Sequence, residues 1–327
     1  MNLFLIFVAL IIAIFLFAPR PRLSAEASYT NTPQQTPAEL EKWLELSETQ
    51  TPNLLESAKA RIQWANPNEK NKTPLSFLYL HGFSASWKET APVTEKLAQE
   101  YSANVVQARI SGHGTGPAGM LTSAEDWLQS VSDQFDIAQQ IGERVVIIAT
   151  STGAPLTVWL AAQEGKKQSN QQKIAACIFL SPNFRIRNAF GFLLTWPWAS
   201  AWIHIILGRE ISWEPGSELE GEVWTHQYST LSLIEMQKVV DWANKQNFGS
   251  FKIPLAMMYM KNDGTIHPPS AIKVFNKWGA EEKELIEVSV DGDATDHVFV
   301  GEITAPHRIE WSVGQLIQFL HKVIKTS

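Results

Sequence analysis

The 327-residue chain has a single cysteine, Cys177, so it cannot form an intrachain disulfide. No histidine pair has the His-Glu-x-x-His spacing and there is no cysteine cluster, so no metal-site pattern is present. Positive charge is also scarce, since 27 Lys and Arg face 33 Asp and Glu and leave a net charge of −6. The sequence therefore gives no case for a nucleic-acid partner. No internal repeat is apparent, and the oligomeric state is left open.

Only one long apolar run occurs, from Leu3 to Ala18, and Pro19-Arg-Pro-Arg follows it. Its length of about 16 residues is slightly below the roughly 17–25 that a spanning helix needs, and above that of most signal-peptide apolar regions. Because no Lys or Arg precedes the run, we expect residues 1–19 to form an uncleaved single-pass membrane anchor. The alternative is a signal peptide cleaved near Ala25-Glu-Ala27, which would make the protein secreted or periplasmic. Arg20 and Arg22 favour a cytoplasmic position for the segment that follows the apolar run, but two charges are too few to decide the orientation in the membrane.

The remainder divides into a tether with a short helix (20–50), a core in two parts (51–184 and 251–327), and a tryptophan-rich insertion (185–250), which we expect to form a helical cap over the active site. Alternating strands and helices indicate a mostly parallel α/β sheet. Ser123 with Asp126 has the pattern of a helix N-cap. The region 54–65 is a candidate edge strand. We expect strands near 76–81, 104–109, 144–150, 174–180, 254–260 and 284–290, and helices near 87–101, 123–141, 153–164, 269–278 and 307–324.

Ser151 ends the apolar strand that begins at Arg144, and small residues surround it. Ala149 and Gly153 flank it at two positions on either side, so a strand and a helix can pass closely at this turn. Such a strand–turn–helix "nucleophile elbow" exposes a serine hydroxyl at the tip of a sheet. The usual pattern has glycine where Ala149 stands, which is a departure of one methyl group.

Two further residues complete a candidate triad in the order Ser, Asp, His. Asp263 follows an apolar strand in the turn Lys261-Asn-Asp-Gly-Thr, and His297 follows the next strand. A serine hydroxyl needs an imidazole to accept its proton, and the imidazole needs a carboxylate on its other nitrogen. We therefore predict Ser151 as nucleophile, His297 as base and then acid, and Asp263 as the orienting carboxylate. The competing carboxylates are Asp296, whose adjacency to His297 makes contact with the ring unfavourable, and two turn residues, Asp291 and Asp293.

Negative charge on the substrate carbonyl oxygen requires an oxyanion hole. The backbone N–H of Thr152 lies at a helix start, where an anion is favoured. The backbone N–H of Phe83 follows Gly82 in the loop after the strand at 76–81. His81 precedes this glycine; we expect it to position the loop, and the alternative is a catalytic role.

Five elements together resemble the α/β-hydrolase superfamily, nearest its esterase, monoacylglycerol-lipase and serine-aminopeptidase-like branch. The resemblance spans about residues 74–325. It implies an eight-stranded, mostly parallel sheet with a lid after the sixth strand, and cofactor-independent hydrolysis of an ester, thioester or amide through an acyl-enzyme. The five elements are His81-Gly-Phe, Arg109-Ile-Ser-Gly-His-Gly, Ala149-Thr-Ser-Thr-Gly, Asp263-Gly-Thr-Ile-His-Pro and Asp296-His297.

The sequence of the cap does not identify the substrate. Its apolar side chains either line an acyl pocket, contact a bilayer or form the cap's own core; the candidates for substrate contact are Phe192, Trp196, Trp198 and Trp202. With the expected anchor, this predicts a serine esterase or lipase acting on an apolar acyl ester, possibly a lipid. One alternative is an aminopeptidase, in which an acidic cap residue would bind the substrate amine; the candidates are Glu210, Glu214, Glu218 and Glu220. The other alternative is a non-catalytic binding protein on the same fold.

Overall fold

A seven-stranded sheet forms the centre of the computed structural model, which describes residues 2–25, 32, 34–289 and 296–324. Its strand order is β1-β3-β2-β4-β5-β8-β9, and every neighbouring pair is parallel except β1 with β3. The central strands are buried almost throughout because helices cover both faces. The strands are β1 (Arg61–Gln63), β2 (Thr73–Leu80), β3 (Asn104–Gln107), β4 (Gly142–Thr150), β5 (Ile174–Leu180), β8 (Leu255–Tyr259) and β9 (Lys283–Glu287).

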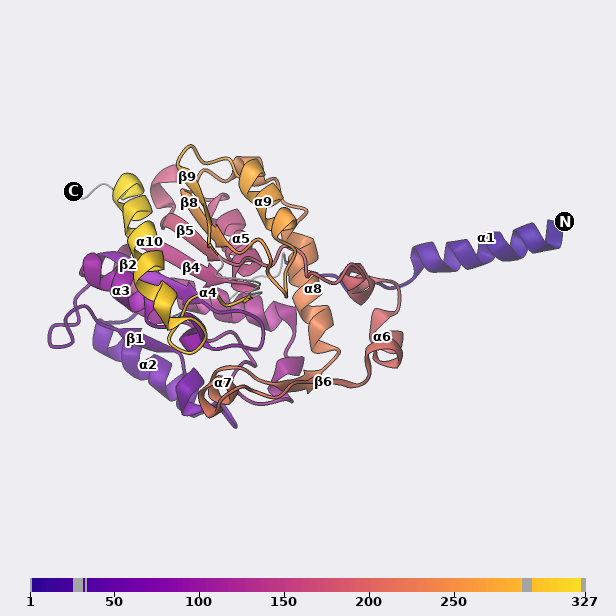
Figure 1. Ribbon diagram of the computed structural model, residues 1–327, viewed down its shortest axis with the longest axis horizontal. Helices are drawn as coiled ribbons and strands as arrows, with labels where there is room; N and C mark the ends of the chain where they lie inside the picture. Colours follow the sequence, from indigo (N-terminus) through magenta and orange to yellow (C-terminus); the bar gives the residue numbers. More distant parts are fainter. Residues whose placement is uncertain (1, 26–31, 33, 290–295, 325–327) are drawn as a thin grey trace.

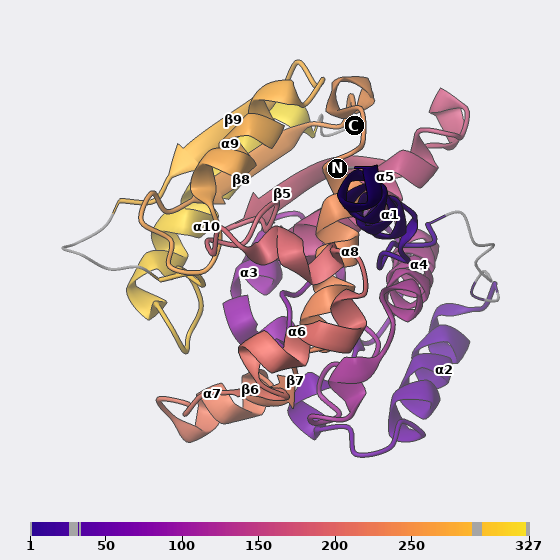
Figure 2. The same ribbon diagram turned by 90° about the vertical axis from the view of Figure 1, so that its right-hand side faces the viewer.

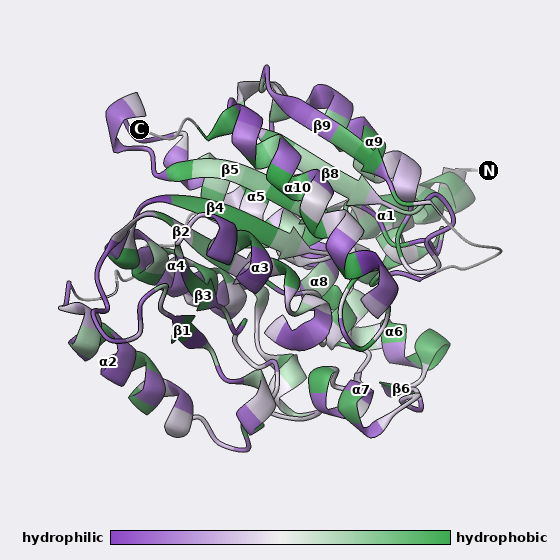
Figure 3. Cartoon of the chain, turned by 60° about the vertical axis from the view of Figure 1, so that its left-hand side comes forward, coloured by the Kyte–Doolittle hydropathy of each residue, from purple (hydrophilic) through white to green (hydrophobic). Residues whose placement is uncertain are grey.

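Two apolar layers sandwich the sheet, because side chains alternate between its faces. In β2, Phe77 and Tyr79 join the layer beneath α3 (Val93–Glu100) and α10 (Ile309–Val323). The residues between and after them, Leu78 and Leu80, point to the other layer. That layer packs against α2 (Pro37–Thr49), α4 (Ala124–Ile141), α5 (Gly153–Glu164), α8 (Ser232–Ala243) and α9 (Pro268–Lys277). Figure 1 shows this arrangement, and Figure 3 shows hydrophobic colouring on the central strands β4 and β5.

The expected strands and helices of the core occur with small shifts at their ends. The Ser123 hydroxyl accepts the Asp126 N–H and caps α4, as predicted. The helix expected over 87–101 is divided into η2 (Trp87–Thr90) and α3, because Pro92 lies between them. The carboxyl-terminal helix is likewise preceded by a separate turn, η7 (Pro306–Arg308).

The sheet has seven strands in the described residues, rather than the eight that the resemblance implies. The segment before β1 contains Pro52, the left-handed residue Asn53 and the short η1 (Glu56–Ala58), a combination unsuited to another strand. As a result the cap follows β5, the fifth strand of the described sheet, instead of the sixth.

The cap is only partly helical. After η5 (Gly191–Thr195) and α6 (Ala199–Leu207), a small antiparallel pair, β6 (Glu210–Ser212) and β7 (Gln227–Ser229), flanks α7 (Glu218–Val223). The chain then returns to the sheet through α8. Figure 2 shows α6, α7, β6 and β7 gathered on one side of the sheet. The cap was predicted to be helical, and the structure adds the short strand pair β6–β7 to its helices.

The amino-terminal helix α1 (Asn2–Phe17) projects away from the body of the molecule (Figure 1). Its 16 residues would extend over about 24 Å, less than the roughly 30 Å of a bilayer's hydrocarbon core. Among the described residues, no helix combines the length and apolarity that crossing a membrane requires. The prediction of a transmembrane anchor is thus unsupported, and the localisation of the protein stays a prediction.

Candidate active site

Ser151 lies in a tight turn between β4 and α5, at the carboxyl edge of the sheet. Its φ of 50° is in the left-handed region, which non-glycine residues adopt only where the surrounding structure imposes it. The turn is held by the Ser151 N–H, which donates to the Leu180 carbonyl of β5 at 3.0 Å. A Cβ atom on Gly153 would approach the Leu80 carbonyl oxygen to 2.3 Å, so glycine is required there. Ala149, by contrast, is accommodated with its methyl group fully buried.

His297 brings together the two residues that the sequence pairs with it. Its Nε2 atom lies 2.8 Å from Ser151 Oγ, and its Nδ1 atom lies 2.8 Å from Asp263 Oδ2. With Asp263 ionised, Nδ1 donates its proton to the carboxylate and Nε2 is free to accept the hydroxyl proton. The structure thus forms a continuous Ser–His–Asp hydrogen-bonded chain.

Asp263 is completely buried and fixed on both oxygens. Its Oδ1 atom accepts the backbone N–H groups of Thr265 at 2.8 Å and Ile266 at 2.9 Å, so that Oδ2 faces the imidazole. The start of the cap supports this loop, because the Arg187 guanidinium donates to the Asp263 carbonyl at 2.6 Å and the Arg187 N–H donates to the Thr265 carbonyl at 2.8 Å. Arg187 was not identified as a site residue, since no local pattern links it to a loop 76 positions away.

The competing carboxylates do not displace Asp263. The side chain of Asp296 turns to Arg308, with an Oδ2–NH1 distance of 3.2 Å. Asp291 and Asp293 lie outside the described residues.

The two backbone N–H groups predicted for an oxyanion hole belong to segments that meet at the nucleophile turn. Thr152 immediately precedes α5, and Phe83 follows the loop glycine Gly82. Neither N–H donates to another described residue, so both are available to an anion. A Cβ atom on Gly82 would lie 3.2 Å from Ser151 Cβ, which places the loop directly against the nucleophile turn.

His81 holds this loop from the interior. Its Nδ1 atom lies 2.9 Å from the Gly82 carbonyl and its Nε2 atom accepts the Ile110 N–H at 3.0 Å, so Nδ1 carries the proton. Burial keeps the pKa of His81 well below its usual value, and the ring is neutral at pH 7. Both nitrogens are used in backbone contacts, which is the loop-positioning arrangement.

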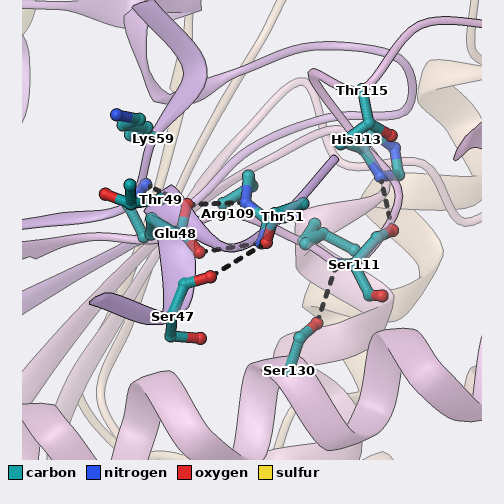
Figure 4. A network of polar contacts seen from close by, with 12 residues as sticks. Ser47, Glu48, Thr49, Thr51, Lys59, Arg109, Ser111, His113, Thr115 and Ser130 are labelled. Atoms are coloured by element: carbon teal, nitrogen blue, oxygen red, sulfur yellow. Dashed lines mark hydrogen bonds and ion pairs between the residues drawn. The ribbon is translucent and has the colours of Figure 1, made fainter. Parts of the chain in front are cut away.

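A buried polar network in turn fixes the loop that carries Ile110 (Figure 4). The Arg109 guanidinium forms a two-point ion pair with Glu48 of α2, at 2.6 and 2.7 Å. Beyond it, the Ser111 N–H donates to Ser130 Oγ at 3.0 Å. His113 Nδ1 lies 3.2 Å from the Ser111 carbonyl, and burial lowers the pKa of His113 to about 4. α2 therefore contributes indirectly to the loop of residues 81–84, which we call the oxyanion loop after its predicted role.

Aromatic side chains crowd the oxyanion loop on its cap side. The Phe83 ring packs edge-on against Tyr228 of β7 at 5.2 Å and near Trp127 of α4 at 6.1 Å. The cap also joins the loop through its backbone, since the Thr225 N–H donates to the Ser84 carbonyl at 2.7 Å. Sequence analysis missed Tyr228 and Trp127, because ring contacts between distant elements leave no local pattern.

The four aromatic residues proposed for substrate contact lie elsewhere in the cap. Trp196 packs against Phe192 at 5.6 Å and against Phe15 of α1 at 5.4 Å, and the Trp202 indole donates to the Pro197 carbonyl at 2.8 Å. Phe192, Trp196 and Trp198 are 38–49% exposed. Within the described part of the chain no ring contact or hydrogen bond joins them to Ser151, Asp263 or His297, so their role in binding substrate stays a prediction.

No group of three or more His, Cys, Asp or Glu side chains suited to a metal ion occurs among the residues that the structure describes. Cys177 is buried in β5, and burial raises the pKa of its thiol far above the usual range.

A known lipase is similar in sequence to part of this chain. The thermostable monoacylglycerol lipase of Bacillus sp. (strain H-257) is 30% identical over 101 residues, which are 31% of this chain and 40% of that protein. The chain thus spans well under half of this relative's length in the match.

Solved structures of lipolytic enzymes share the fold. One from the metagenome-derived pair LipS and LipT has a TM-score of 0.65 at 19% identity, covering 82% of this chain and 99% of that chain. The monoacylglycerol lipase of Paleococcus ferrophilus has a TM-score of 0.56 at 14% identity, covering 80% and 98%. A soluble variant of the monoglyceride lipase of Saccharomyces cerevisiae has a TM-score of 0.56 at 15% identity, covering 82% and 92%. At such identities the likeness concerns the fold alone.

The model of the alpha/beta hydrolase family matches residues 77–301, a segment that contains Ser151, Asp263, His297 and the whole cap. This match covers more than half of the chain, and the strand order and the Ser–His–Asp chain are consistent with it. The protein therefore belongs to the alpha/beta hydrolase family.

Proposed function

We propose that the protein is a serine esterase or lipase that cleaves an apolar acyl ester through an acyl-enzyme. The observation that carries the proposal is the hydrogen-bonded chain from Ser151 Oγ through both His297 nitrogens to Asp263. The lipase and esterase neighbours in sequence and fold favour an ester as the substrate class.

In the proposed first step, Ser151 Oγ attacks the ester carbonyl while His297 Nε2 takes the hydroxyl proton. The carbonyl oxygen becomes an oxyanion, which the N–H groups of Phe83 and Thr152 would bind. Asp263 stabilises the imidazolium and holds its orientation. The imidazolium then returns the proton to the departing alkoxide, which leaves as the alcohol.

In the second step, water replaces the alcohol. His297 takes one proton from this water, which attacks the acyl carbonyl, and the bond to Ser151 Oγ breaks as the proton returns to the serine. The products are a carboxylic acid and the free enzyme, so the cycle requires no cofactor.

An apolar acyl group suits the surroundings of the oxyanion loop. Phe83, Trp127 and Tyr228 provide aromatic surface beside the proposed reaction centre. A cavity of about 510 Å³ lies between the cap and residues 115–118; its described lining includes Thr225, whose N–H donates to the Ser84 carbonyl, but no residue of the triad. This volume is within the range of small-molecule sites.

Purified protein should hydrolyse p-nitrophenyl esters and react with a fluorophosphonate probe, and we expect turnover to rise from the acetate to medium-chain esters. Aminoacyl p-nitroanilides, assayed in parallel, test the aminopeptidase alternative. Cleavage of the anilides without ester turnover would replace the proposal by that alternative. Absence of both activities and of labelling would favour a binding protein.

A further inference from the structure

Glu89 is a buried carboxyl group behind the oxyanion loop that the proposed reaction steps leave unused. It lies in η2 and is 1% exposed. Its Oε1 atom accepts the Gly82 N–H at 2.6 Å and the Tyr79 hydroxyl at 2.9 Å. Because Phe83 follows Gly82 directly, the carboxyl group restrains the peptide unit next to the one that would bind the oxyanion.

Tyr79 extends this contact to the nucleophile turn. Its hydroxyl also lies 2.8 Å from Thr150 Oγ1, and Thr150 immediately precedes Ser151. Gly82 gives a second link, since a Cβ atom there would lie 3.1 Å from Glu89 Oε2 and 3.2 Å from Ser151 Cβ. The carboxyl group and the nucleophile side chain therefore both lie next to this one glycine.

The backbone of η2 and the following residue, Ala91, also contacts the loop that follows His297. Gly301, four residues after His297, has a φ of 138°, and a Cβ atom there would approach the Glu89 carbonyl oxygen to 2.5 Å. The Glu302 N–H donates to the Ala91 carbonyl at 2.9 Å. One short segment thus contacts the oxyanion loop, the nucleophile strand through Tyr79, and the loop that carries the imidazole.

Burial raises the pKa of Glu89 to about 7, while the bonds from Gly82 and Tyr79 and the nearby His297 lower it. Among the described residues, the titratable groups that act on it are Tyr79 of β2 and His297. Its sequence neighbour Lys88 points instead toward the Trp87 ring. The ionised carboxylate is the stronger acceptor for the Gly82 N–H. The negative charge of Glu89 would stabilise the His297 imidazolium and destabilise the oxyanion. Because these two effects partly cancel, the hydrogen bond to the Gly82 N–H is the main contribution of Glu89 to the rate.

We propose that Glu89 is a positioning residue, whose carboxylate fixes Gly82 and thereby aims the Phe83 N–H at the oxyanion. The inference rests on the proposed function. It adds a determinant of rate that contacts neither substrate nor the reacting atoms.

The near-isosteric variant Glu89→Gln tests it, with Glu164→Gln as the matched control. Glu164 is also a buried carboxyl group that accepts a backbone N–H, that of Lys173 at 2.5 Å, but it lies at the far end of α5 near the start of β5. We expect Glu89→Gln to lower kcat for a p-nitrophenyl ester about tenfold with KM within about twofold, a smaller effect than the 10²–10³ for losing an oxyanion donor. The fluorophosphonate labelling rate should fall in parallel.

The pH profile separates positioning from a merely structural role. In the wild type, kcat/KM should fall in two steps as the pH is lowered, and protonation of Glu89 should cause the upper step, near pH 7. The variant Glu89→Gln should lack this upper step, and Glu164→Gln should retain both steps. Wild-type kcat and two steps in Glu89→Gln would overturn the inference alone. A wild-type protein that neither turns over esters nor labels would overturn the proposed function and this inference with it.

Discussion

His297 Nε2 lies 2.8 Å from Ser151 Oγ, although the two residues are 146 positions apart in the chain. The contact exists because β4 and the loop after β9 end at the same edge of the sheet, with β5 and β8 between them. In parallel α/β sheets this carboxyl edge is where reactive groups gather.

Replacing Ser151 by alanine should abolish fluorophosphonate labelling and reduce ester turnover by about 10⁴-fold or more, because among the described residues Ser151 Oγ is the hydroxyl that His297 Nε2 contacts. Ser181→Ala is a matched control: Ser181 follows β5 as Ser151 follows β4, is buried, and has a φ of 42°. Its Oγ has no hydrogen-bond partner among the described residues, so its loss should leave turnover unchanged. Labelling that persists in Ser151→Ala would refute the assignment of the nucleophile.

Asp263→Asn should lower kcat by roughly 10³–10⁴-fold, because an amide in place of the carboxylate no longer enforces the productive tautomer of His297. Asp296→Asn serves as the control, since this neighbour of His297 pairs with Arg308 instead. Steady-state kinetics should give near wild-type values for it. A greater loss of kcat in Asp296→Asn than in Asp263→Asn would reassign the orienting carboxylate.

The elbow itself can be tested at its two small positions. Gly153→Ala should destabilise the protein by more than about 3 kcal/mol or prevent folding, because the new methyl group would lie 2.3 Å from the Leu80 carbonyl oxygen. Ala149→Gly restores the more usual glycine and should cost only about 1 kcal/mol while retaining activity. Urea denaturation measures both changes, and an equally stable Gly153→Ala protein would show that strand and helix are less close than described.

Glu89 should also influence how stability depends on pH. Its pKa of about 7 in the folded protein exceeds the usual value of 4.5, so its protonated form stabilises the fold at low pH. This contribution to the free energy of unfolding, up to about 3 kcal/mol, is fully present below about pH 4.5 and is lost as the pH rises through 7. Relative to the wild type, Glu89→Gln should therefore gain stability between pH 5 and pH 8.

Urea unfolding of both proteins at the two pH values measures this difference, and it does not depend on any substrate. Glu164→Gln again provides the comparison, because it leaves Glu89 intact. Parallel pH dependence of the wild type and Glu89→Gln would mean that Glu89 does not titrate in this range.

Local signals in the chain were sufficient for the elements of the core. The apolar runs of β4 and β5 are long, β4 is rich in β-branched residues, and α4 has an explicit cap at Ser123, so their positions follow from local chemistry. The cap was harder to predict, because β6 and β7 have only three residues each and their pairing depends on the rest of the fold. The amino-terminal run was correctly read as apolar, but its helix is too short for the predicted span.

By itself, the sequence was sufficient to predict the hydroxyl, imidazole and carboxyl groups that the structure brings into hydrogen-bond contact, because each follows a strand whose apolar pattern is local. Only the tertiary structure decided which side chains surround them. Arg187 reaches the site from the start of the cap, Tyr228 from β7 within the cap, and Glu89 from η2. Their contacts depend on how distant elements pack. Packing of this kind is a property of the whole sheet and its layers, so no window of the sequence records it.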